Sequence, residues 1–131
     1  MKPQIIGLTA VALVLSSVAA HAAEPDVAAG KSVYKKCTAC HFYNKEKLKV
    51  GPHLVGIVGR KAGVVEGYRY SKGLKKAAEE GLVWDETSLD KYLEKPRAFI
   101  KRGKMAFAGL KDPQDRANVI AFLKAEAKLP E

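Results

Sequence analysis

Apolar residues recur at helical spacing near the C-terminus of the chain, in the segment DPQDRANVIAFLKAEAK (residues 112–128). Asp112 is placed to cap a helix there, and Pro113 suits its first turn. The expected buried face comprises Val119, Ile120, Leu123 and Ala127. The pattern therefore predicts a C-terminal amphipathic helix.

A second helix is predicted near the start of the domain, from Asp26 as its N-cap into the segment that ends at Cys40. Its expected inner face comprises Val27, Gly30, Val33, Tyr34 and Cys37. The spacing indicates that this helix also packs one face against the rest of the molecule.

Two shorter helices are predicted between these ends. One begins after Ser71 and ends at Gly81. The other is capped by Asp85 or Thr87, ends before Pro96, and buries Leu89, Tyr92 and Leu93.

The middle of the chain, VGPHLVGIVGRKAGVVEGYRY (residues 50–70), is rich in glycine and reads as irregular loop. No segment alternates well enough to predict a strand, so the expected class is all-α with long connecting loops. Long loops in a compact domain usually serve a function. Here they can wrap a cofactor.

The first 22 residues have the order of a secretory signal: Lys2, an apolar run of 16 residues from Ile5 to Ala20, and the small-residue motif Ala20-His21-Ala22. The run is shorter than the roughly 20 residues needed to cross a bilayer. We expect cleavage after Ala22 and a single periplasmic domain of residues 23–131, with an uncleaved membrane anchor as the alternative.

The chain is strongly basic, with a formal charge of +9 that becomes +8 when Lys2 is removed with the leader. Basic proteins often bind nucleic acid, but export and the lack of a nucleic-acid-binding motif argue against that class. An anionic protein or membrane surface is the more reasonable partner.

The sequence KKCTACHF contains the two cysteines of the chain, Cys37 and Cys40, followed directly by His41. A disulfide there would close a loop of two residues and stabilise little. A dithiol redox pair favours a helix N-terminus, whereas this pair is expected at the C-terminal end of the predicted helix. Zinc needs three or four protein ligands, and His53 is the one other histidine after the leader. A C-x-x-C-H motif is typical of covalent haem attachment, which uses all three residues.

A haem iron held by His41 needs a sixth ligand, and Met105 is the one methionine after the leader. Met105 lies in KRGKMAFAGLKD, a glycine- and lysine-rich segment between two predicted helices, where a core-filling methionine is unexpected.

The chain from residue 23 onward resembles a class I cytochrome c of the short bacterial type, similar to the mitochondrial protein. The resemblance rests on GKSVYKKCTACH, GPHLVGIVGRKAG, GYRYS and KMAFAGLKD, followed by Arg116 and VIAFLK. It implies an all-α fold in which N- and C-terminal helices pack together, with Gly30 and Tyr34 against Phe122, and loops wrap one covalent haem c.

The resemblance also implies roles for individual residues. Cys37 and Cys40 would form the thioethers, and His41 and Met105 would be the axial iron ligands. The Pro52 carbonyl would accept a hydrogen bond from His41 Nδ1, and Tyr92 would hydrogen-bond toward the Met105 sulfur. Three further residues would surround the haem propionates: Arg60, Tyr70 and Trp84.

These implications describe a monomeric electron carrier, not an enzyme, that transfers one electron at a time between larger complexes. Candidate partners are quinol-cytochrome c reductase, a terminal oxidase, a photosynthetic reaction centre or a periplasmic dehydrogenase. Docking onto their acidic surfaces would use Lys35, Lys36, Lys45, Lys95, Lys101 and Lys104.

The sequence departs from the family pattern before Met105, where FIKRGKM replaces the usual Tyr-Ile-Pro-Gly-Thr-Lys stretch. Leu74 stands where asparagine is frequent, and His53 stands where a neutral amide is common. We interpret His53 as a surface residue. These changes suggest that the segment before Met105 is less rigid than in the family. This supports the alternative function, a haem sensor or a peroxidase-like protein with a labile sixth ligand.

Overall fold

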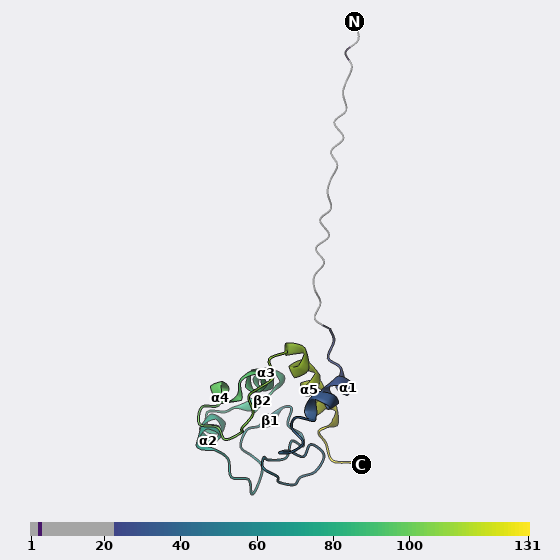
Figure 1. Cartoon of the computed structure of the whole chain (residues 1–131). Helices are drawn as coiled ribbons and strands as arrows, with labels where there is room; N and C mark the ends of the chain where they lie inside the picture. The colour runs from purple at the N-terminus through teal and green to yellow at the C-terminus, as the bar shows by residue number, and fades with distance from the viewer. Residues whose placement is uncertain (1–2, 4–22) are drawn as a thin grey trace.

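The computed structural model describes residue 3 and residues 23–131, so that the predicted signal sequence and its cleavage site lie almost wholly outside the described part (Figure 1). Within residues 23–131, five helices and one pair of short strands surround a central cavity. In residues 23–131, every helix is too short or too polar to cross a bilayer.

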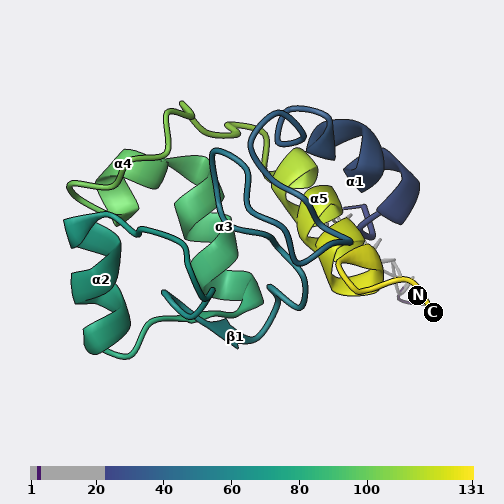
Figure 2. The ribbon, with the colours of Figure 1, turned by 90° about the horizontal axis from the view of Figure 1, so that it is seen from below.

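The terminal helices α1 (Val27–Tyr34) and α5 (Pro113–Glu126) pack against each other, as predicted (Figure 2). Gly30 permits their close approach, because a Cβ atom there would collide with the backbone carbonyl of Asn118. Next to this contact, the ring centroids of Tyr34 and Phe122 lie 5.4 Å apart. The predicted stripe of α5 (Val119, Ile120, Leu123) is buried.

Side-chain caps begin these helices at the predicted residues. Asp26 accepts a hydrogen bond from the Ala29 amide at 2.9 Å, and Asp112 accepts one from the Gln114 amide at 2.8 Å. The Asp26 amide in turn donates to the buried Asn118 side chain at 2.8 Å. This bond fastens the start of α1 to α5.

The prediction that the first helix extends to Cys40 was wrong, because α1 ends at Tyr34. Residues 35–40 form tighter turns, in which the Cys37 amide donates to Tyr34 at 2.8 Å and the Cys40 amide to Cys37 at 3.1 Å. The Thr38 hydroxyl donates to the Lys35 carbonyl at 2.9 Å, a local bond that competes with the helical pattern.

Two of the middle helices match their predictions, α2 (Lys72–Glu79) after Ser71 and α3 (Glu86–Glu94) after Asp85. Asp85, rather than Thr87, is the cap. The four-residue α4 (Pro96–Phe99) was not predicted, because Pro96 ends one helix and at the same time starts the next.

The strands β1 (Arg60–Lys61) and β2 (Val83–Trp84) form an antiparallel pair with Arg60 opposite Trp84. Two residues are too few to show an alternating pattern, so the sequence could not predict them. The pair ties the central loop to the start of α3.

Candidate functional site

One mostly apolar cavity of about 530 Å³ brings together every predicted site residue. Its lining comes from the α1 end, the central loop, α3, and the segment before α5. The predicted residues that line it are Cys37, Cys40, His41, Pro52, Arg60, Tyr70, Trp84, Tyr92 and Met105. Residues up to 68 positions apart in sequence therefore meet at one site.

The two cysteines are unpaired thiols in the turns that follow α1, and both are half-buried. Burial raises the pKa of Cys37, and the neighbouring Cys40 raises it further. This location after a helix C-terminus does not activate a thiolate. His53, the further ligand that a zinc site would need, lines a different pocket.

His41 is held in a defined orientation. Its Nδ1 donates to the Pro52 carbonyl at 2.7 Å, and this partner assigns the proton to Nδ1. Burial lowers the pKa of His41, so the ring is neutral at pH 7. Its Nε2 lone pair is thereby available to a metal. A Cβ at Gly51 would collide with the ring, which explains the glycine at that position.

The Met105 sulfur has a hydrogen-bond donor from α3. The Tyr92 hydroxyl lies 3.7 Å from Met105 Sδ and donates to it. Burial raises the pKa of Tyr92 to about 12, so the phenol keeps its proton near neutral pH. Tyr92 also packs against Trp84, with ring centroids 4.8 Å apart.

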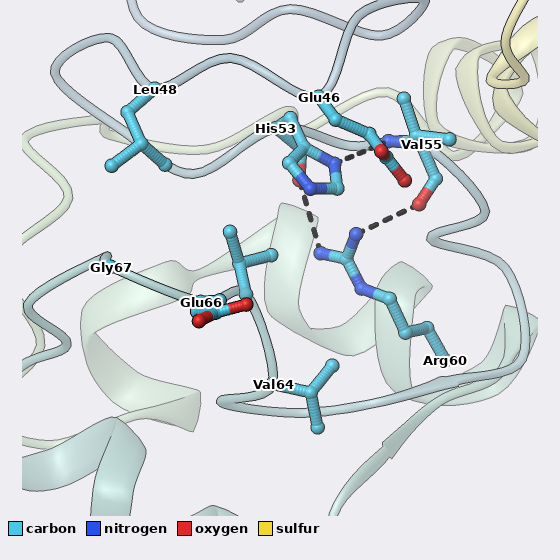
Figure 3. A pocket seen from close by; sticks show the side chains of 9 residues that line it. Glu46, Leu48, His53, Val55, Arg60, Val64, Glu66 and Gly67 are labelled. Atoms are coloured by element: carbon cyan, nitrogen blue, oxygen red, sulfur yellow. Dashed lines mark hydrogen bonds between the residues drawn. The ribbon is translucent and has the colours of Figure 1, made fainter.

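Arg60 lines both the cavity and a second, outer pocket, which Figure 3 shows. One terminal nitrogen donates to the Val55 carbonyl at 2.8 Å and the other donates to the His53 carbonyl at 3.1 Å. Its Nε is buried without a partner. Tyr70, which also lines the cavity, accepts a hydrogen bond from the Val65 amide at 3.0 Å.

Two contacts at the site were not predicted. The buried Tyr34 hydroxyl donates to the His41 carbonyl at 2.9 Å, whereas the sequence suggested only ring packing for Tyr34. Lys104 donates to the Arg69 carbonyl and lies over the Tyr68 ring, 4.4 Å from its centroid. No sequence signal identifies either contact, because each depends on the conformation of a loop backbone.

All six lysines predicted for docking are exposed. Lys36 and Lys104 also line the cavity and thus lie at its boundary with solvent. The site therefore combines an apolar interior with a basic rim.

Comparison with known proteins agrees with this geometry. The model of the family described as cytochrome c matches residues 27–126. The chain belongs to the cytochrome c family. This cytochrome is 50% identical to cytochrome c2 of Afifella marina over 99 residues, which cover 75% of this chain and 80% of that protein.

Cytochrome c2 of Rhodomicrobium vannielii is 46% identical to this cytochrome over 127 residues, covering 96% of the chain and 98% of the relative. Among solved structures, cytochrome cH from Methylobacterium extorquens is similar, with a TM-score of 0.71 and 42% identity. The match covers 77% of this chain and 99% of that one. The class I cytochrome c fold predicted from the sequence is confirmed.

Membership makes this cytochrome an electron-transfer protein with one covalent haem c, rather than an enzyme. The residues present fit that group. The cavity offers two thiols, a neutral imidazole and a thioether. The unpartnered Nε of Arg60 offers a charged donor, as an acidic haem substituent requires.

Proposed function

We propose that this cytochrome is a periplasmic carrier that passes single electrons between larger redox complexes. The observation that carries the proposal is the convergence of Cys37, Cys40, His41 and Met105 on one cavity. Each of the two candidate iron ligands has its own supporting hydrogen bond: His41 Nδ1 donates to the Pro52 carbonyl, and Met105 Sδ accepts from the Tyr92 hydroxyl.

In this proposal, Cys37 and Cys40 would hold the haem through thioethers, and His41 and Met105 would ligate its iron. The bound haem supplies a one-electron couple at its iron. Pro52 fixes the His41 ring and increases its basicity. The Tyr92 hydroxyl withdraws electron density from the Met105 sulfur, and the apolar wall excludes water. Arg60, with Tyr70 and Trp84 nearby, would face the propionates.

Docking is proposed to use Lys36 and Lys104 at the cavity boundary together with four further exposed lysines, Lys35, Lys45, Lys95 and Lys101. The exposure of all six and the positive net charge support this role. Exposed lysines of this kind accelerate the encounter with acidic surfaces, and added salt reduces this acceleration. The partners would be acidic redox proteins such as a quinol-cytochrome c reductase, a terminal oxidase, a reaction centre or a periplasmic dehydrogenase.

The periplasmic location follows from the proposed signal sequence, residues 1–22. Its support is the order of one basic residue, an apolar run and the Ala20-His21-Ala22 motif. The working protein would then comprise residues 23–131 as one cytochrome c domain.

Carbon monoxide distinguishes this carrier from a haem sensor with a labile sixth ligand. We expect the absorption spectrum of the reduced holoprotein to stay unchanged when carbon monoxide is added, because Met105 closes the sixth position. The matched control, Met105→Ala, should shift its spectrum under the same conditions. A wild-type protein that shifts as fully as the variant would establish the sensor-like alternative instead.

A further inference from the structure

An outer pocket of about 540 Å³ lies beside the haem cavity, and Arg60 lines both (Figure 3). Its apolar lining includes Leu48 and Val64, which are 44% and 52% exposed. The ionisable side chains that line this pocket are Glu46, His53, Arg60 and Glu66. A change of charge in the outer pocket can therefore affect the haem cavity through Arg60, the residue that lines both.

His53 is half-buried in this outer pocket. Its Nδ1 accepts a hydrogen bond from the Val55 amide at 3.2 Å. Because Nδ1 accepts, the ring is neutral and carries its proton on Nε2. The imidazole thus closes a short turn over residues 53–55.

This turn holds the guanidinium of Arg60. The carbonyls of His53 and Val55 each accept one hydrogen bond from it, at 3.1 and 2.8 Å. Figure 3 shows the three bonds as one connected network of His53, Val55 and Arg60. The imidazole stabilises the turn, and the turn orients Arg60, which lines the haem cavity and whose Nε is buried without a partner.

Protonation of His53 is incompatible with this network. An imidazolium has a hydrogen on both nitrogens, so Nδ1 can no longer accept from the Val55 amide. The added positive charge also lies close to Arg60. Burial lowers the pKa of His53, Arg60 lowers it further, and Glu46 opposes both. Glu66 faces the same pocket. The neutral ring consequently prevails at pH 7, and protonation requires a lower pH than for an ordinary histidine.

We propose that His53 is a positioning residue for Arg60 and that it couples electron transfer to the binding of one proton. At neutral pH the neutral ring keeps Arg60 in place. At lower pH, His53 Nδ1 takes a proton from solvent, the bond to Val55 breaks, and the new positive charge favours the reduced haem. The redox partner supplies the electron, and no other bond changes.

Linkage makes this coupling reciprocal. If protonation of His53 raises the reduction potential, then reduction must raise the pKa of His53 by an equivalent amount. The inference rests on the proposed function, because it presupposes a bound haem. A preparation that contains no covalent haem would refute the proposed function, whereas a potential independent of His53 would refute the inference alone.

The test uses the holoprotein and two variants between about pH 4.5 and 8, the range in which histidine titrates. His53→Asn offers an amide oxygen to the Val55 amide but does not titrate. His53→Leu offers no acceptor. The measurements are the reduction potential against pH and the NMR titration of the His53 ring in both oxidation states.

We expect the His53 pKa to be higher in the reduced protein by at least about 0.3 unit, a twofold change in proton affinity. The wild-type potential should fall as pH rises through this pKa. His53→Asn should keep the neutral-pH potential without this step, and His53→Leu should alter the potential even at neutral pH. An equal pKa in both oxidation states, or an unchanged step in His53→Asn, would overturn the proposal.

Discussion

At the scale of single residues, one backbone angle bears directly on how firmly Met105 is held. Arg102 has a φ of 61°, in the left-handed region that suits glycine. It lies three residues before Met105, where the family usually has glycine. Lys104 fastens this segment to the Arg69 carbonyl, whereas the exposed Lys101 has no such anchor among the contacts described. The backbone strain at Arg102 therefore weakens the hold on Met105, whereas the hydrogen bond of Lys104 to Arg69 strengthens it.

Arg102→Gly should hold Met105 on the iron to higher pH. Removing the Cβ relieves about 1 kcal/mol of backbone strain, equivalent to roughly 0.7 pH unit in the midpoint at which a deprotonated lysine displaces the sulfur. The near-infrared iron–sulfur band of the ferric protein, titrated with base, reports this midpoint. Lys101→Ala should also raise it, since it removes a competing amine.

The matched control for this strain is Arg102→Ala, which loses the guanidinium but keeps the Cβ. It should lose the band at nearly the wild-type pH. Equal midpoints for the glycine and alanine variants would show that charge, rather than backbone strain, sets the strength of the Met105 bond.

At the scale of elements, the sequence predicts helices where a capping side chain precedes an apolar stripe. Asp26, Ser71, Asp85 and Asp112 all cap as expected. The end of α1 could not be predicted, because the hydrogen bond of the Thr38 hydroxyl to the Lys35 carbonyl competes with helical hydrogen bonds. The periodicity of apolar residues does not reveal this bond. The pair β1 and β2, like α4, is too short to leave a pattern.

The contact between α1 and α5 gives a direct test of the packing. Gly30→Ala should lower the free energy of unfolding by about 2–3 kcal/mol, because the new Cβ would overlap the Asn118 carbonyl and lie 2.8 Å from Phe122 Cβ. Guanidinium denaturation of the holoprotein measures the change. Ser32→Ala, on the exposed side of the same helix, should stay within about 0.5 kcal/mol. Equal stability of the two variants would contradict the tight interface.

At the scale of the whole molecule, the site depends on the meeting of residues that are distant in sequence, which the spacing of apolar residues alone cannot predict. Met105 follows His41 by 64 residues, and the need of a His41-bound iron for a sixth ligand, not periodicity, indicated that they meet. The fold brings both to one cavity. The resemblance also indicated the bond from His41 to Pro52. The network of His53, Val55 and Arg60 was missed, because its bonds depend on the backbone conformation of an irregular loop.

The central claim is that His41 and Met105 hold the iron of one covalent haem from two distant parts of the chain. The near-infrared absorption spectrum of the ferric holoprotein at pH 7 tests it most directly. We predict an iron–sulfur band in the wild type that disappears in Met105→Ala while the haem remains covalently attached. A wild-type protein without this band, or a band that survives in Met105→Ala, would contradict the account.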